Sequence, residues 1–256
     1  MGAVSNTAVR SAFNRIDTEY RPAGGPPGHP GAPAPSSPGR PFSASRAFDK
    51  LAGLCIAALV AGIVGFFAVP ADAAYGFMVV AFALVMVGWL RIRWARYIAP
   101  SYSVVEGLAL GSVSREFSSF GHGIVPTAIV FTAAVFVGAL VLYRTGLVRV
   151  TPRMMSLAFM GAFGIMAVGF LSLVGLSVPG LDSLTGAGLI FTVLMLGIAV
   201  LNLFTDFQFV VQSEARGVSA EGEWAAAFAM MTALVLVYIS MLRILGAAYG
   251  GGGRRG

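Results

Sequence analysis

Long apolar stretches separated by short polar segments fill the chain from Leu51 to Ala248. Most reach the length of about 20 residues that an α-helix needs to cross the hydrocarbon layer of a bilayer. The pattern predicts seven spanning helices, over Leu51–Val69, Ala74–Leu90, Tyr102–Val113, Gly123–Tyr143, Met154–Val178, Gly186–Val211 and Trp224–Ala248. The expected fold class is therefore an all-α membrane protein, a bundle of seven transmembrane helices.

The third predicted span, Tyr102–Val113, is the shortest and the most polar, so a re-entrant segment is an alternative there. Prolines support the other boundaries, because proline is tolerated at helix ends and disrupts helix interiors. All prolines that follow the N-terminal region fall at or near an expected helix end, and none falls in mid-span: Pro70, Pro100, Pro126, Pro152 and Pro179.

The chain divides into three parts by composition. Residues 1–46 are rich in Pro and Gly and cannot bury enough apolar surface to offset chain entropy, which predicts a disordered tail. Residues 47–249 hold the seven helices, and residues 250–256 form a short Gly/Arg-rich tail.

Charge is scarce and unevenly placed. Only 11% of the residues are charged and 57% are apolar, with a formal net charge of +6. The basic residues flank the apolar runs, which is how membrane proteins fix their orientation, so a nucleic-acid partner is not expected. Their alternation places the N-terminus in the cytoplasm of a multi-pass protein of the cell membrane. Seven spans then put the C-terminus outside, although Arg254 and Arg255 favour the inside.

Few residues are suited to chemistry. Cys55 is the only cysteine and lies in an apolar run, and the two histidines, His29 and His122, fall in the tail and in a loop. A structural metal site of high affinity is therefore not expected. No phosphate-binding loop, nucleophile-elbow or zinc-protease motif occurs, so neither an enzyme nor a cofactor is expected.

Asp206 is the strongest functional candidate, because it follows some twenty mostly apolar residues of the sixth span. A carboxylate near mid-bilayer costs roughly 3 kcal/mol, so it is rarely left facing lipid. Asn202 lies one helical turn before it on the same face. We expect a proton sensor or ion ligand, and the alternative is that Asp206 marks the cytoplasmic end of its helix.

Glu106 is the other acid well inside an apolar run. Gly107 and Gly111 follow it with the GxxxG spacing that lets a neighbouring backbone approach closely. A polar seam with a titratable group and a plain packing face are both consistent with this segment. Arg243, late in the seventh span, is expected to extend to an interface, with a countercharge to Asp206 or Glu106 as the alternative.

Four segments, SVVEGLALGSVSREF, LYRTGLVRVTPR, AVLNLFTDFQFV and EWAAAFAMMTALVLVYISMLRIL, together resemble the Bax inhibitor family of transmembrane Bax-inhibitor-motif proteins, in its bacterial branch. The resemblance covers roughly Arg91 to Leu245. It implies six helices around a central seventh and a calcium leak that responds to pH. It also implies a proton sensor made of two aspartates, on the sixth and seventh helices.

Asp206 matches the sixth-helix aspartate of that resemblance, but the seventh predicted span, Trp224–Ala248, contains no Asp or Glu. Glu106, or Glu223 at the start of that helix, then serves as the partner, or the chain lacks that gate. Asp206, Asn202 and Glu106 with water offer calcium a weak and transient set of oxygens, which suits conduction.

Three functions are therefore carried forward. The leading one is a passive, pH-modulated leak for calcium or other cations with Asp206 in its pathway. The second is a regulatory protein that binds a membrane-protein partner, such as a protease of a stress response. Deleting residues 1–46 separates these two, since a leak should survive that deletion. The third is a proton-coupled transporter, although no internal repeat supports it.

Overall fold

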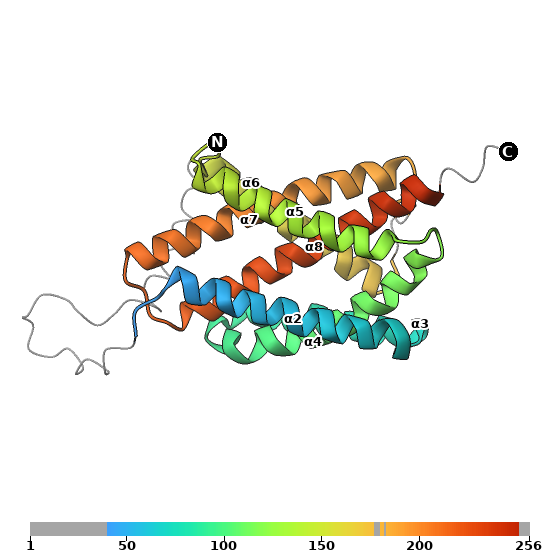
Figure 1. Ribbon diagram of the computed structural model, residues 1–256, viewed down its shortest axis with the longest axis horizontal. Coiled ribbons are helices and arrows are strands. Elements are labelled where there is room, and N and C mark those ends of the chain that lie inside the picture. The colour runs from blue at the N-terminus through green and yellow to red at the C-terminus, as the bar shows by residue number, and fades with distance from the viewer. Residues whose placement is uncertain (1–39, 177–179, 182, 251–256) are drawn as a thin grey trace, which may run out of the picture.

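The computed structural model describes residues 40–176, 180–181 and 183–250, and all of its regular structure is helical. The predicted N-terminal tail to residue 39 and the C-terminal residues 251–256 lie outside the described residues. The described residues form seven α-helices, which run roughly along the long axis of the molecule (Figure 1). Their bounds are α2 Ala44–Ala68, α3 Ala71–Leu90, α4 Ala95–Ser118, α5 Ile124–Arg144, α6 Pro152–Leu173, α7 Ala187–Ala215 and α8 Gly222–Gly250, with a 3₁₀ turn, η1, over Ile92–Trp94.

The seven-helix prediction is confirmed, and six of these helices are long and apolar enough to cross a membrane. The remaining helix, α4, is long enough to cross, since its 24 residues extend about 36 Å, but it is too polar to count as a membrane span. The prediction of a short third span was therefore wrong. Hydropathy alone predicts a loop before Tyr102. The burial of Ala95, Ile98 and Ala99 between exposed residues instead follows the repeat of an α-helix.

Pro100 is the second correction, because it lies inside α4 rather than at a helix end. Its missing N–H leaves the carbonyl of Arg96 without the usual i−4 hydrogen bond. Arg96 belongs to the first turn of the helix and is exposed, so that carbonyl has access to water. The proline therefore costs less here than it would in the middle of a spanning helix.

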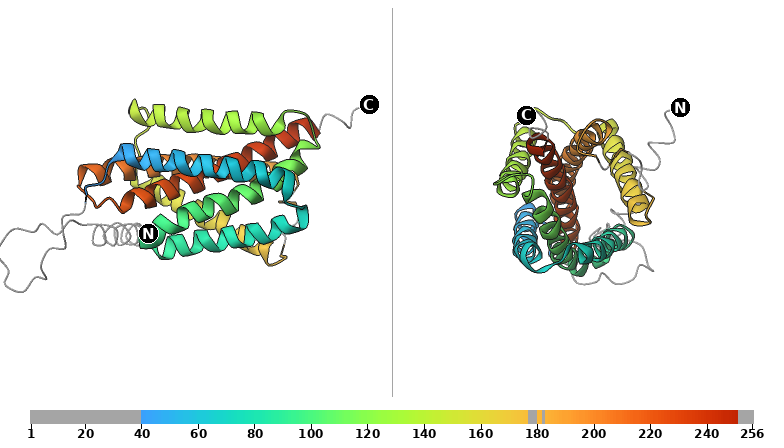
Figure 2. Two further views of the ribbon diagram at one scale, coloured as in Figure 1. Left: turned by 60° about the horizontal axis from the view of Figure 1, so that its bottom comes forward. Right: turned by 90° about the vertical axis from the view of Figure 1, so that its right-hand side faces the viewer.

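Helix α8 is the most buried of the candidate spans. In its most apolar stretch of 18 residues, 56% are buried, against 33% for α7 and 17–22% for the other spans. It packs against α2, α4, α5 and α7. The end-on view in Figure 2 shows α8 running between the other helices. The expectation of a central last helix is met, because α8 packs against four other helices and apolar residues fill most of its length.

The closest pair of helices is α2 and α4, which cross where both carry glycine. A Cβ added at Gly107 would lie 2.5 Å from the carbonyl oxygen of Ala58 and 2.8 Å from the Cβ of Ala61. A Cβ at Gly111 would overlap the Gly62 carbonyl and lie 2.7 Å from the Phe66 nitrogen. Only glycine allows this approach, and lipid supplies no hydrophobic force to replace the lost packing.

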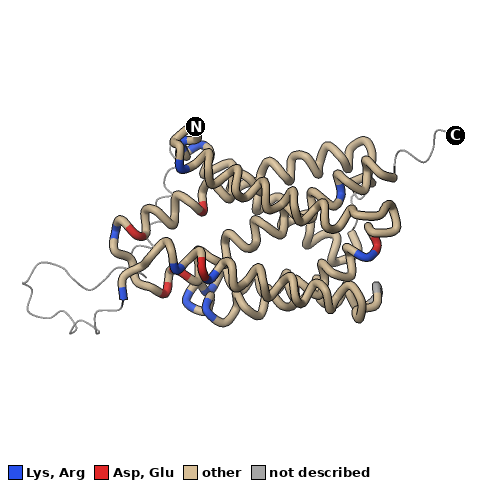
Figure 3. Tube along the Cα trace, viewed as in Figure 1, with Lys and Arg blue, Asp and Glu red and all other residues tan. Residues whose placement is uncertain are grey.

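Charged residues gather at the two ends of the bundle and are sparse between them (Figure 3). The end where α2 begins also holds the α3–α4, α5–α6 and α7–α8 connections, and it carries most of the cations; we call it the basic end. The last described residues lie at the opposite end from the first (Figure 1). A chain that crosses seven times must have this arrangement. Arg254 and Arg255 fall outside the described residues.

Candidate functional site

Asp206 lies on the inward face of α7. Four residues one and two turns away from it are buried, at positions i−7, i−3, i+4 and i+7: Ala199, Leu203, Val210 and Ser213. The helix continues for nine residues past Asp206 to Ala215, so this acid does not mark a helix end. Asp206 itself is partly exposed, as is Asn202 one turn before it. Its carboxylate is thus turned away from lipid while a part of the residue stays accessible.

The neighbours of α7 define the direction in which Asp206 points. Helix α8 meets α7 at Thr192, whose hydroxyl accepts a hydrogen bond from Arg243, and α6 meets it at Ile198, which packs on Gly161. At 100° per residue, Asp206 lies about 40° from Thr192 and about 80° from Ile198 around the helix axis. It therefore faces the arc between α8 and α6.

On one side that arc is bounded by α6, which packs loosely, as does its neighbour α3. Helix α6 packs extensively only on α7, and α3 only on α4. The two helices meet each other through side chains: the Tyr75 hydroxyl bonds the Leu173 carbonyl, and two aromatic pairs join Phe82 to Phe170 and Trp89 to Phe159. No ion pair or hydrogen bond of the described residues engages the Asp206 carboxylate.

Glu106 faces inward from α4 on the other side of α8. Its neighbours Tyr102, Ser103 and Ala109 are buried, and the Tyr102 ring packs edge-on against Phe228 of α8 at 5.4 Å between centroids. The hydroxyl of Ser103, one turn before Glu106, is fully buried without a hydrogen-bond partner. An unsatisfied buried hydroxyl costs about 1–3 kcal/mol, so this spot favours a water molecule or another polar partner.

The two acids lie at nearly the same depth along α8. Contacts of α4 with α8 at Phe228 and Tyr238 bracket Glu106, and the Thr192–Arg243 bond aligns antiparallel α7 with α8. Counting residues from these contacts places both acids near residues 229–231 of α8, about 10–14 Å from the start of that helix. Because α4 and α7 pack on different sides of α8, the structure does not bring Glu106 and Asp206 together.

Arg243 lies far from both acids. Its Nε donates to Thr192 Oγ1 at 2.9 Å, and its Nη2 donates to the Leu181 carbonyl at 2.6 Å. It borders a cavity of about 410 Å³ at the end opposite the basic end, lined by Glu116, Phe117, Ser119, Phe120, Leu184 and Arg243. More than three helical turns separate it from the level of the acids, so it is not their countercharge.

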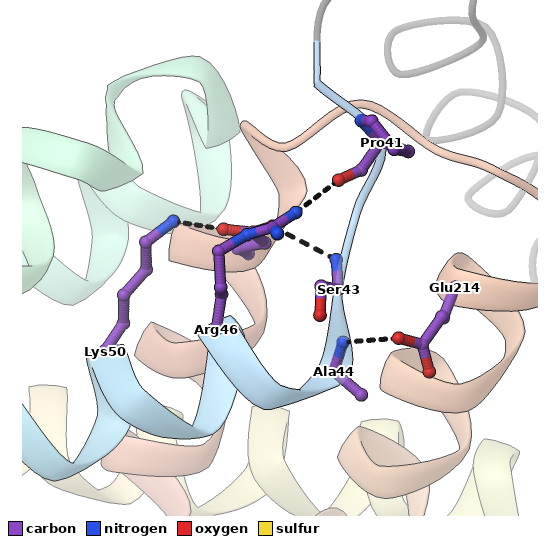
Figure 4. Close-up of polar contacts among 7 residues, drawn as sticks. Pro41, Ser43, Ala44, Arg46, Lys50 and Glu214 are labelled. Carbon is purple, nitrogen blue, oxygen red and sulfur yellow. Dashed lines mark hydrogen bonds and ion pairs between the residues drawn. The ribbon is translucent and has the colours of Figure 1, made fainter.

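Glu223 also has other partners than Asp206. Its side chain is 2% exposed and accepts from Arg46 Nε at 2.8 Å and from Lys50 Nζ at 2.5 Å, both on α2 (Figure 4). The backbone N–H of Ser43 donates to the same carboxylate at 3.1 Å. We call Glu223, Arg46 and Lys50 the buried triad. It joins the first turn of α8 to the first turns of α2.

The chain just before α2 is part of the same assembly. Residues Arg40–Ser43, here called the strap, run beside the α7–α8 turn, with Phe42 N bonded to Val218 O at 2.7 Å and Ala220 N to Arg40 O at 2.9 Å. Phe42 is 3% exposed. Glu214, near the end of α7, accepts the Ala44 N–H at 3.0 Å (Figure 4).

Sequence reasoning missed the strap and both cations of the triad, because it placed residues 40–46 in the tail and began the first span at Leu51. The one available signal was the charged pair Asp49-Lys50 with Arg46 one turn before, on a stretch that continues as a helix. A prediction from hydropathy starts the helix only at the first long apolar run, so it leaves out charged first turns like these.

Phe207, next to Asp206, anchors an aromatic cluster that was not expected either. Its ring lies 6.3 Å from Phe48 of α2, and 5.6 and 5.9 Å from Phe136 and Tyr143 of α5. Phe207 is one residue nearer the basic end than Asp206. The cluster therefore fills the bundle on the α2–α5 side of α7 at the depth of the acid.

A model of the family described as Bax inhibitor 1 like matches residues 8–249, which includes all seven described helices nearly to the end of α8. No curated protein matches the chain significantly.

Proposed function

Since the chain belongs to the Bax inhibitor 1 like family, we propose that this multi-pass membrane protein is a passive, pH-modulated leak for calcium or other small cations, with Asp206 in the pathway. One observation carries the proposal: Asp206 faces inward on α7, toward the loosely packed arc between α8 and α6, and it has no hydrogen-bond or ion-pair partner among the described residues.

An ionised carboxylate without protein partners must be solvated by water or neutralised by a cation or a proton. Asp206, with the amide of Asn202 one turn away, supplies few of the six to eight oxygens that calcium takes, so a passing ion keeps most of its water. Weak coordination is what a leak requires, because an ion must leave as readily as it enters. A proton on Asp206 removes the charge that attracts the cation.

The direct test is calcium flux into liposomes that contain the full-length protein, measured across pH. Asp206→Asn holds the site in the uncharged state, so its flux should be the same at every pH and should equal the acidic limit of the wild type. Glu116→Gln changes an exposed acid at the end of α4 and should keep the wild-type profile. An Asp206→Asn protein that keeps the wild-type pH profile would remove Asp206 from the mechanism.

We further propose that the basic end faces the cytoplasm of a protein in the cell membrane. Arginines of the α3–α4 and α5–α6 connections support this assignment, since Lys and Arg are enriched on the cytoplasmic side. They are Arg91, Arg93, Arg96, Arg144, Arg149 and Arg153. A reporter active only in the cytoplasm should work when fused before the strap and fail when fused after residue 256.

A regulatory function is the second candidate, with a membrane-protein partner such as a protease. The strap favours it, because it attaches whatever precedes residue 40 to the turn before the central helix. A deletion that separates the two functions should end at residue 39, since residues 40–46 are packed. Calcium flux should survive this deletion, whereas capture of the membrane partner through the tail should not.

A further inference from the structure

The buried triad occupies the end of the seam between α2 and α8. Going inward from the basic end, Lys50 bonds Glu223 and also lies over the Trp224 ring, with 4.9 Å from its Nζ to the ring centroid. Five residues further along α2, about 7.5 Å deeper, the Cys55 sulfur contacts the Met231 sulfur of α8 at 3.9 Å. Met231 lies at the depth of Glu106 and Asp206. Contacts at the triad therefore close the end of a seam that extends inward to the depth of both acids.

Because Glu223 is charged and buried, the contact between the start of α2 and α8 is either fully formed or fully broken. Glu223 is desolvated and depends on three donors, from Arg46, Lys50 and the Ser43 backbone. Separating Ser43 and the first two turns of α2 from α8 removes all three donors from the carboxylate, so water must enter to replace them. A seam held by apolar contacts alone would loosen gradually, without a requirement for water.

The strap is linked to the triad, so a movement of the strap would affect the triad. Phe42 packs against Gly222 and Val218 at the α7–α8 turn, and the Arg46 Nη2 donates to the Pro41 carbonyl at 2.5 Å. Arg46 therefore binds the strap and Glu223 together. Displacing the strap removes a hydrogen bond from Arg46 and uncovers the residue before Glu223.

We propose that the buried triad and the strap form a gate at the basic end, and that breaking the triad admits water along the α2–α8 seam to the depth of Glu106 and Asp206. This inference rests on the proposed leak for its physiological meaning. Its physical content, the entry of water, does not depend on calcium transport.

Cys55 provides the readout, because it is the only thiol of the chain and lies in the seam below the triad. The full-length protein in liposomes is treated with a small cationic methanethiosulfonate, which reacts with thiols only where water reaches them. The thiolate attacks the reagent sulfur, forms a mixed disulfide and releases methanesulfinate. Wild-type Cys55 should react slowly.

Glu223→Gln should raise the reaction rate of Cys55 at least about tenfold, because it leaves two cations at the seam without their carboxylate. Asp49→Asn is the matched control: it changes an exposed acid of α2 that belongs to neither the triad nor the strap, and it should leave the rate unchanged. An unchanged Cys55 rate in Glu223→Gln would overturn the gate.

A thiol at a second position distinguishes local opening at the triad from general unfolding of the protein. In a Cys55→Ser background, Ala128→Cys places the thiol in the buried cluster of Ile124 and Leu242, at the far end of the bundle. Glu223→Gln should not change its reaction rate; an equal rise at positions 55 and 128 would mean general loosening and would overturn the gate. Flux separates the remaining cases: local entry of reagent without any calcium flux supports the gate and refutes the leak.

Discussion

The glycine crossing of α2 and α4 gives the sharpest test of the packing. Gly111→Ala adds one methyl group where the Gly62 carbonyl and the Phe66 nitrogen already lie, the latter 2.7 Å from the new carbon. Ordinary van der Waals contact begins at 3.4 Å, so the two backbones must separate by at least about 0.7 Å, and by more at the Gly62 carbonyl, which lies closer still. No flexible side chain is available to give way, because both obstacles are backbone atoms.

A gap of that size forfeits roughly a quarter to a half of each atom-pair attraction along the crossing. We therefore expect Gly111→Ala to lower the free energy of unfolding by about 1–3 kcal/mol. The midpoint of thermal unfolding of the protein in detergent should fall by about 2–12 °C.

Gly53→Ala is the matched control on α2, because a Cβ there meets nothing within 4 Å. It should leave the midpoint unchanged or raise it slightly, since alanine favours a helix over glycine by up to about 1 kcal/mol. Equal midpoints for Gly111→Ala and Gly53→Ala would refute the close crossing.

Two further changes test the interior of the bundle by the same melting assay. Phe207→Ala empties the position among three aromatic rings and should cost about 2–4 kcal/mol, whereas Phe163→Ala, at a residue 68% exposed toward lipid, should cost under about 1 kcal/mol. Similar costs for the two would contradict the inward position of Phe207. Tyr238→Phe removes the hydroxyl that lies 2.7 Å from the Ser114 hydroxyl, and should cost only about 0.5–1.5 kcal/mol because Ser114 keeps its bond to the Leu110 carbonyl. A loss above about 3 kcal/mol would mean that this contact supports more than one hydrogen bond.

The number of helices was predictable because lipid leaves the backbone no other choice. A chain segment in hydrocarbon must satisfy its own N–H and C=O groups, so each apolar run of sufficient length becomes a helix. Six of the seven spans were found in this way within a few residues at most boundaries; the exceptions are the early start of α2 and the end of α6, which lies at Leu173 rather than Val178. Hydropathy failed at α4, where the helix is stabilised by a buried face opposite Arg96 and Tyr97 rather than by uniform apolarity.

The candidate acids were also visible in the sequence, since a carboxylate inside an apolar run is expensive wherever it occurs. Their directions were not visible. Asp206 faces the arc between α8 and α6 because of where Thr192 and Ile198 make contact, and those contacts depend on helices that are distant in sequence. The same holds for Glu223, whose partners on α2 lie more than 170 residues away.

The amino-acid sequence by itself determined the class, the helices, the rare intramembrane acids and the family resemblance, which the family match confirms. Each of these depends on local composition, because each segment enters or avoids the hydrocarbon layer according to its own residues. Tertiary structure alone decided that Glu106 and Asp206 lie on different sides of α8, and that residues 40–50 join the packed bundle. Those outcomes depend on which helix faces which, and in a bilayer this is set by shape and by a few polar contacts rather than by hydrophobicity.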